Sequence, residues 1–212
     1  MDLILWRHAD AQDADGMDIA DLSRPLTPKG RKQAAKMAKW IDARLAEAAR
    51  ILVSPAIRTR ETADALGRKV TIIPELAPGG LAAHVLIAAD WPDARRPVLV
   101  VGHQPALGRA ASLLLFGQEQ DLSLRKAGIL WITNRSRKDH GDAQALLTLR
   151  AAMCPDLLKK NGTQGGAGMS TGETAKVGSR RHRRRRRLTH YTLHSVQRRD
   201  GLLRTPLTTV RP

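Results

Sequence analysis

Polar side chains suited to binding phosphate stand directly after three short apolar runs of the sequence. Arg7 and His8 follow the first run, Ser54 and Arg58 follow the second, and His103 follows the fourth. If these runs are strands of one open α/β sheet, their carboxyl ends meet at one edge, where ligands bind in such sheets. Guanidinium groups pair well with phosphoryl oxygens. The residue types therefore indicate a phosphoryl-binding site.

Two helix N-termini are expected to point at the same site. Ser54-Pro55 combines a capping side chain with a proline and predicts a helix that runs to about Leu66. Pro105 opens a further helix after Gln104. Helix N-termini favour a phosphoryl group because they offer partial positive charge and unpaired N–H groups. The sequence contains no Walker-type glycine-rich loop and no HExxH or DxDxDG pattern, so we expect a site without metal or cofactor.

Apolar runs alternate with helical patterns through the first 160 residues, which is typical of parallel βαβ units. Thr27 and Pro28 predict a helix start, and apolar residues then recur every three or four positions to about residue 48. The fourth run has the continuous apolar character of a central strand, whereas the last two strands are expected at a sheet edge. The predicted strands are 3–6, 51–53, 70–73, 98–101, 128–133 and 145–150, and the predicted helices are 28–48, 54–66, 81–90 and 105–115.

Four motifs, in this order along the chain, resemble the histidine phosphatase superfamily. Within it, the first two resemble the SixA-type phosphohistidine phosphatases. The resemblance spans about residues 1–160 and implies a three-layer α/β/α sandwich with a mostly parallel central sheet, as in phosphoglycerate mutase. The common superfamily triplet ends in Gly where this chain has Ala9, a choice that suits the SixA type. The motifs are Arg7-His8-Ala9-Asp10-Ala11, Asp21-x-x-Arg24-Pro25-Leu26-Thr27-x-x-Gly30, Ser54-x-x-x-Arg58-x-x-x-Thr62 and Gly102-His103.

The resemblance implies a role for each polar residue of the site. His8 would attack phosphorus through a neutral ring nitrogen, with its other nitrogen protonated and directed at a backbone carbonyl. Arg7, Arg58 and His103 would hold the non-bridging oxygens, on which the transition state spreads its charge. Ser54 would support the phosphate. Arg24 either reaches the phosphate or braces the loop before the helix that begins at Thr27.

The general acid is the least defined part of the site. Glu75, just after the third predicted strand, and Asp21 are the two candidates, and the sequence favours neither. A site without an acid would fit a phosphohistidine substrate. The P–N bond is labile, and imidazole leaves readily once its own ring is protonated.

The charge of the chain is concentrated in its last quarter. The whole chain has 36 Lys and Arg against 20 Asp and Glu, a net charge of +16. Residues 161–212 carry a net +10 in a glycine-rich run followed by an arginine block, and we expect this tail to be disordered. It is either a genuine basic extension or the product of a shifted reading frame or a missed stop codon. A genuine tail would bind nucleic acid through phosphate contacts, without sequence preference.

These observations lead to one preferred function and two alternatives. The preferred hypothesis is a metal-independent phosphatase acting on phosphohistidine in a partner protein, for example a histidine phosphotransfer domain. The alternatives are a phosphatase for a small phosphoester, such as a sugar phosphate, and a nucleic-acid-binding protein that uses the tail. The single Cys154 excludes a disulfide framework, and no apolar run is long enough to span a membrane. Because the N-terminus lacks a signal-peptide pattern, we expect a cytoplasmic protein. We also expect a monomer.

Overall fold

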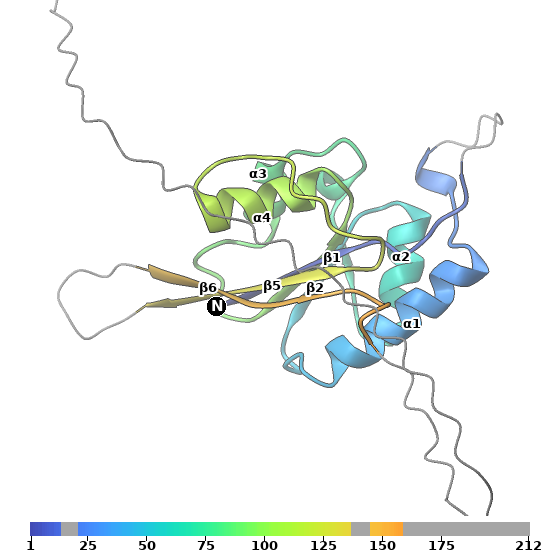
Figure 1. Ribbon diagram of the computed structural model, residues 1–212, viewed down its shortest axis with the longest axis horizontal. Helices are drawn as coiled ribbons and strands as arrows, with labels where there is room; N and C mark the ends of the chain where they lie inside the picture. The colour runs from blue at the N-terminus through green and yellow to red at the C-terminus, as the bar shows by residue number, and fades with distance from the viewer. Residues whose placement is uncertain (14–20, 137–144, 159–212) are drawn as a thin grey trace, which may run out of the picture. The chain divides into compact units, whose positions relative to one another are not determined.

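A computed structural model describes residues 1–13, 21–136 and 145–158. Its centre is a six-stranded sheet in the order β3-β2-β4-β1-β5-β6 (Figure 1). β3, β2, β4 and β1 pair in parallel, whereas β5 and β6 are antiparallel. The expectation of a mostly parallel sheet with the last strand at its edge is therefore confirmed. The strands are β1 (Asp2–Arg7), β2 (Arg50–Val53), β3 (Thr71–Ile72), β4 (Val98–Gly102), β5 (Ile129–Ser136) and β6 (Ala145–Met153).

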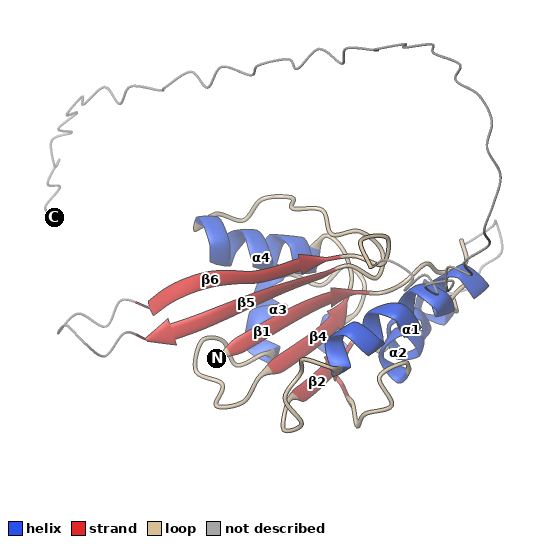
Figure 2. Cartoon of the chain, turned by 60° about the horizontal axis from the view of Figure 1, so that its bottom comes forward, coloured by secondary structure: helices blue, strands red, loops and turns tan. Residues whose placement is uncertain are grey.

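Helices cover both faces of the sheet, which gives the expected three-layer α/β/α arrangement (Figure 2). α1 and α2 pack in one apolar cluster with one face, and α3 and α4 pack in a second cluster with the other. The helices are α1 (Pro28–Asp42), α2 (Ile57–Asp64), α3 (Ala82–Ala88) and α4 (Ala106–Phe116), with short 3-10 turns η1 (Asp21–Ser23) and η2 (Pro74–Leu76).

The strand sequences explain why the sheet is buried on both faces. Along β1, Ile4 and Trp6 belong to the cluster with α1 and α2, while Leu3 and Leu5 belong to the cluster with α3 and α4. Side chains of a strand alternate between faces, so a continuous apolar run can fill both. All five residues of β4 are buried for the same reason. Each large apolar side chain buried in this way contributes about 1.5–3 kcal/mol to folding.

The start of α1 is positioned against the segment that follows β1. Thr27 caps the helix, and its Oγ1 accepts a hydrogen bond from the Gly30 N–H at 2.9 Å. A Cβ at Gly30 would lie 1.9 Å from the carbonyl oxygen of Asp10, so only glycine permits this approach. The sequence after His8 is thereby fixed to the first turn of α1.

α1 ends earlier than the apolar periodicity predicts. The helix stops at Asp42 rather than near residue 48, although Leu45 is still buried. Arg68 donates to the carboxylate of Asp42 at 2.7 Å and to the carbonyls of Leu45 and Ala46 at 3.2 and 3.0 Å. These bonds come from a distant part of the chain, which the apolar periodicity does not indicate. They hold Asp42, the last residue of the helix, and two carbonyls of the segment that follows it.

α2 begins three residues later than predicted, and the interpretation of Ser54 as its cap is wrong. The helix starts at Ile57, and Ala56 occupies the capping position without a side-chain hydrogen bond. The Ser54 hydroxyl instead contacts His103. α4 begins at Ala106, as the Pro105 pattern predicts.

Two expectations concern features beyond this architecture. No helix in the part of the chain described above is both long and apolar enough to cross a membrane. The predictions for the tail, residues 161–212, lie outside the described residues.

Candidate active site

The predicted site residues meet at the carboxyl ends of β1, β2 and β4. The backbone N–H of His8 donates to the carbonyl of Gly102 at 3.1 Å, and that of Ser54 donates to Val101 at 3.1 Å. These bonds continue the sheet pairing beyond the strands. The rings of His8 and His103 lie 5.2 Å apart between centroids. The expected convergence at one sheet edge is therefore present.

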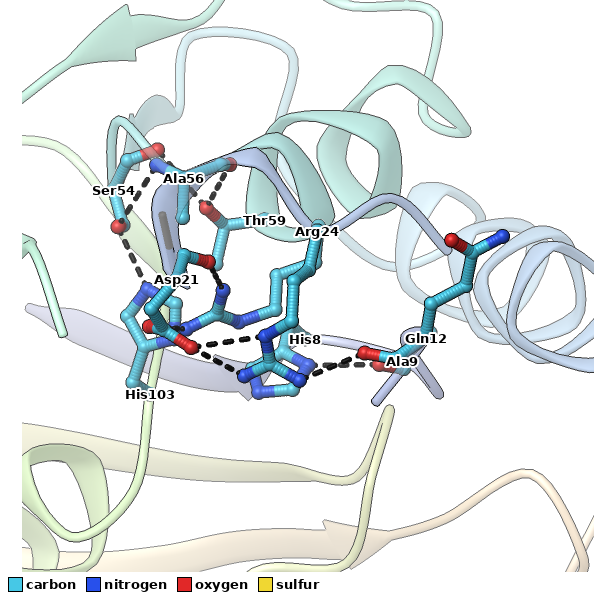
Figure 3. A network of polar contacts seen from close by, with 10 residues as sticks. His8, Ala9, Gln12, Asp21, Arg24, Ser54, Ala56, Thr59 and His103 are labelled. Atoms are coloured by element: carbon cyan, nitrogen blue, oxygen red, sulfur yellow. Dashed lines mark hydrogen bonds and ion pairs between the residues drawn. The ribbon is translucent and has the colours of Figure 1, made fainter. Parts of the chain in front are cut away.

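His8 has the protonation pattern of a nucleophile. Its Nδ1 lies 2.7 Å from the carbonyl oxygen of Ala9 (Figure 3). A carbonyl only accepts, so Nδ1 carries the proton and Nε2 keeps its lone pair. Burial, with added repulsion from Arg58 and Arg7, lowers the pKa of His8 to about 4 despite the Ala9 contact. The imidazole is therefore neutral at physiological pH.

His103 is held by Ser54 beside His8. Its side chain is only 5% exposed, and its Nε2 lies 2.7 Å from the Ser54 Oγ (Figure 3). The Ala56 N–H approaches the same Oγ at 3.4 Å, which leaves the hydroxyl hydrogen for Nε2. In that arrangement the proton of neutral His103 is on Nδ1. Burial, followed by repulsion from Arg58, lowers the pKa of His103 to about 3.

Arg58 is almost fully buried, and a single residue of η1 fixes its guanidinium. The side chain is 3% exposed, its Nη1 donates to the backbone carbonyl of Asp21, and its Nη2 donates to the Asp21 carboxylate at 2.7 Å. Arg24 donates to the same carboxylate at 2.5 and 2.9 Å and to the carbonyl of Gln12 at 2.8 Å (Figure 3). In this state Arg24 braces the loop, which is one of the two roles that the sequence left open.

Several buried donors at the site have no partner. The Arg7 guanidinium donates from Nη1 to the carbonyl of Leu124 at 2.6 Å. Five buried side-chain atoms of the described residues lack a hydrogen bond, and three of them are Arg7 Nε, Arg58 Nε and His103 Nδ1. An unsatisfied buried donor costs about 1–3 kcal/mol, so such groups call for an explanation. Donors of this kind suit an anionic ligand with several acceptor oxygens.

Two further side chains, Thr62 and Gln33, hold the backbone after His8. The Thr62 Oγ1 accepts from the Ala9 N–H at 3.0 Å and donates to the carbonyl of Arg58 at 2.6 Å. The Gln33 Oε1 accepts from the Asp10 N–H at 3.1 Å. The sequence placed Thr62 in a motif but gave it no role, and no sequence signal pointed to Gln33. Both side chains fix the backbone that follows His8, Thr62 from α2 and Gln33 from α1.

The two candidate acids differ in where the structure places them. Burial alone would raise the pKa of Asp21, but hydrogen bonds from Arg58 and Arg24 outweigh it and hold the pKa below its usual range. Asp21 is therefore ionised at neutral pH, which runs against a general-acid role. Glu75 is exposed on η2 and has no side-chain hydrogen bond or ion pair to another described residue. Within the described ranges, no three His, Cys, Asp or Glu side chains gather as a metal site would require.

Comparison with known proteins agrees with this geometry. The family model of the histidine phosphatase superfamily (branch 1) matches residues 3–79. An uncharacterized protein of Picosynechococcus sp. is 38% identical over 141 residues, which cover 61% of this chain and 83% of that protein. The phosphohistidine phosphatase SixA of Escherichia coli is 32% identical over 127 residues, which cover 56% of this chain and 76% of SixA. This chain belongs to the histidine phosphatase superfamily.

The structural likeness extends to a solved member of the superfamily. The structure of the protein histidine phosphatase SixA complexed with tungstate aligns with 75% of this chain and 100% of its own, at a TM-score of 0.57 and 28% identity. The likeness in sequence and in structure supports a phosphatase activity for this histidine phosphatase. A shared fold does not select a substrate, so the substrate must be argued from the site.

Proposed function

We propose that this protein is a metal-independent phosphohistidine phosphatase that acts on a partner protein through a phosphorylated His8. The observation that carries the proposal is the set of unpaired buried donors on Arg7, Arg58 and His103 beside the neutral His8. A phosphoryl group offers three equatorial oxygens, which match these donors in number and charge. Tungstate, the ligand in the related SixA structure, is an oxyanion of similar shape.

In the first step the phosphoryl group moves from the substrate histidine to His8. The lone pair of His8 Nε2 forms the new P–N bond, and the electron pair of the old P–N bond returns to the substrate nitrogen. Arg7, Arg58 and His103 hold the charge that spreads over the phosphoryl oxygens. His103 gains a proton readily when a dianion is bound, because the negative charge stabilises its imidazolium.

In the second step water attacks the phosphorus of phospho-His8. The P–N bond breaks and its electron pair returns to Nε2. Inorganic phosphate is released, and free His8 is regenerated. The Ala9 carbonyl accepts a hydrogen bond from Nδ1–H throughout, so the ring keeps one orientation in both steps. A fixed ring keeps the nucleophile aligned with phosphorus, which is a large part of the rate advantage in phosphoryl transfer.

The absence of a protonated carboxyl group at the described site favours a phosphohistidine substrate over an alkyl phosphoester. Asp21 has a lowered pKa, and the Glu75 side chain makes no hydrogen bond or ion pair with the described site residues. An alkoxide needs a proton donor to leave, whereas a substrate imidazole protonated on its far nitrogen leaves as a neutral molecule. The SixA relative, a phosphohistidine phosphatase by name, supports the same choice.

Asp21 is proposed here as a positioning residue rather than an acid. Its carbonyl and carboxylate bind both terminal nitrogens of Arg58, which leaves the Nε of Arg58 as the unpaired donor. A guanidinium fixed in this way loses little freedom when phosphate binds. The charge of Asp21 also offsets part of the cost of keeping Arg58 buried.

The test is a comparison of substrates with the full-length protein. A protein phosphorylated on histidine, free phosphohistidine, phosphoserine and a sugar phosphate are assayed in excess EDTA for release of phosphate. We expect kcat/KM for the phosphohistidine protein to exceed that for both phosphoesters by at least about a hundredfold, because only its leaving group departs without an acid. Preference for a phosphoester, or loss of activity in EDTA that Mg²⁺ restores, would contradict the proposal.

A further inference from the structure

A second basic region adjoins the site, in a cavity of about 950 Å³. Arg7 and Asp10 both line this cavity, and they flank His8 in the sequence. The cavity therefore reaches the site at Arg7, the residue that precedes His8. Its lining comes from the start of α1, from the loop before β5 and from the segment after β6, and consists of Arg7, Asp10, Lys29, Lys32, Gln33, Lys36, Ser123, Leu124, Arg125, Lys126, Pro155 and Asp156.

Half of the six cationic side chains that line the cavity come from one face of α1. Lys29, Lys32 and Lys36 recur at spacings of three and four residues, which places them in a row along the helix. At 1.5 Å per residue this row is about 10 Å long. The end of β6 passes close to α1 (Figure 1), and Lys36 Nζ donates to the Pro155 carbonyl at 2.6 Å. The row thus forms one wall of the cavity.

The positive charge of this wall is not balanced within the cavity. Asp10 pairs with Lys126 at 2.5 Å, and Asp156 pairs with Arg125 at 2.9 Å. Those pairs use the only two carboxylates among the lining residues. The remaining cations include Lys29 and Lys32, which are exposed and make no side-chain hydrogen bond or ion pair to any described residue.

The position of these two lysines is also unfavourable for the helix itself. Lys29 lies in the first turn of α1 and Lys32 in the next, and the first turn contains no acidic residue. The helix macrodipole disfavours positive charge near the N-terminus, where glutamate or aspartate would stabilise the helix. Helix stability therefore does not explain the two lysines.

We propose that this cavity docks carboxylate side chains on the surface of the phosphorylated partner protein, beside its phosphohistidine. The inference rests on the proposed function and adds the chemistry of the partner: an acidic surface next to the phosphorylated histidine. Opposite charge across such a rim accelerates encounter and orients the partner, more than it adds final affinity.

The construction of the cavity favours a protein surface over a small anion. Lysine ammonium groups lie at the end of flexible side chains, so they can pair with carboxylates whose positions vary. A site for a single phosphate instead uses a rigid, fixed guanidinium group such as that of Arg58. In the lysine row of the cavity wall, Lys29 and Lys32 are exposed and Lys36 is half-buried, whereas the apolar lining residues Leu124 and Pro155 are buried. The accessible part of the wall is therefore exposed charge of one sign, which is suited to steering a protein partner.

The test reverses the charge of the two unpaired lysines in the full-length protein. Lys29→Glu/Lys32→Glu is assayed on a purified histidine phosphotransfer domain, phosphorylated on its histidine and carrying carboxylates beside it, and on free phosphohistidine. At low ionic strength we expect the variant's kcat/KM for the domain to be about tenfold or more below that of the wild type, mainly through a higher KM. The difference between variant and wild type should become smaller as salt is added. Turnover of free phosphohistidine should stay within about twofold, because no catalytic contact is touched.

The matched control reverses Arg95 and Arg96, two exposed arginines just before β4 at the opposite end of that strand from His103. Arg95→Glu/Arg96→Glu changes the net charge by the same amount as the lysine variant. Its effect on kcat/KM therefore measures the contribution of net charge far from the cavity. We expect it to keep kcat/KM for the domain within about threefold. The lysine variant should melt at or above about the wild-type temperature, since glutamate near the start of α1 favours the helix. The arginine variant should melt near the wild-type temperature, because both of its substitutions are on the surface.

The possible outcomes separate this inference from the proposed function. If the wild type hydrolyses neither the phosphorylated domain nor free phosphohistidine, the proposed function fails and the docking inference fails with it. If the wild type hydrolyses both and the lysine variant loses neither, only docking is overturned. If the lysine variant loses kcat/KM equally on the two substrates, the cavity binds a small anion instead and the docking inference is overturned. If the arginine control loses as much kcat/KM for the domain as the lysine variant does, the effect comes from net charge alone and the docking inference is likewise overturned. Recovery of the lysine variant on a domain whose carboxylates are replaced by lysine would support direct pairing.

Discussion

The protein has two basic regions side by side that are built in opposite ways. At the site, Arg58 and His103 are 3% and 5% exposed, and fixed polar contacts hold them in place. In the adjoining cavity, Lys29 and Lys32 are exposed and without such contacts among the described residues. The difference shows how one charge sign can serve two tasks. Stabilising a transition state requires donors that are already oriented, whereas steering a protein surface requires only charge of the right sign.

The comparison predicts that substitutions at the buried region reduce turnover of every substrate, and that substitutions in the exposed cavity reduce turnover of proteins alone. The predictions below apply this contrast to the buried region first, in order of decreasing effect.

The largest effect is expected for His8→Ala, which removes the attacking nitrogen. We expect kcat/KM to fall by at least about 10⁴-fold on both protein and small substrates, because the unprotonated nitrogen of the other imidazole, His103, is held by the Ser54 hydroxyl. The fold should be retained, since His8 lies past the end of β1. Steady-state assays and circular dichroism check both points, and substantial residual turnover would refute the mechanism.

Arg58→Ala should have the next largest effect. Loss of one oriented donor to the phosphoryl group costs on the order of 2–4 kcal/mol of transition-state stabilisation, which is about 30- to 1000-fold in kcat/KM. The matched control is Arg60→Ala on the same helix, where the side chain is exposed. Similar kinetics for the two alanine variants would mean that burial and orientation of Arg58 are not what matters.

The sequence was sufficient to predict which polar residues meet at one edge of the sheet, because the relevant signals are local. Arg7 and His8 end an apolar strand, and a parallel sheet must bring such ends together. Ser54 was placed near the site correctly but for a wrong reason. A serine before a proline resembles a helix cap, yet its hydroxyl is used by His103, which is 49 residues away in the sequence.

Contacts between distant segments account for what the sequence did not indicate. Arg68 caps the end of α1 from outside the helix, so the apolar periodicity overestimated the helix length. Thr62 and Gln33 reach the backbone after His8 from two different helices. The basic cavity combines three segments of the chain, and only its lysine row on α1 has a local pattern.

A smaller effect is expected for Thr62→Val, which keeps the shape of the side chain but removes both hydrogen bonds of Oγ1. The Ala9 carbonyl orients His8, so a shift of this backbone should lower kcat by about tenfold through misalignment. KM should change little, because no phosphate contact is lost. Steady-state kinetics with free phosphohistidine measure kcat and KM separately. Threonine to serine at the same position retains the hydroxyl and should restore most of the rate.

The smallest effect is expected for deletion of residues 161–212. We propose that catalysis resides in residues 1–160, so turnover of free phosphohistidine should stay within about threefold after the deletion. Non-specific binding to DNA should fall sharply at low salt, because the deletion removes +10 of the +16 net charge. A loss of turnover with the fold intact would place part of the site in the tail. The coding DNA near codon 161 would decide between a genuine extension and a frame error.

The central claim is that His8 carries the phosphoryl group during turnover. The most direct measurement mixes the full-length protein with an excess of phosphorylated substrate protein, quenches it in alkaline denaturant within the first turnovers, and maps the modification by mass spectrometry. We predict one phosphoryl group on Nε2 of His8, stable in base and lost in acid. His8→Ala should carry no such label. In Arg58→Ala the amount of labelled His8 should increase only if the second step slows more than the first. Normal turnover with no label on His8, or a label elsewhere that persists in His8→Ala, would contradict the account.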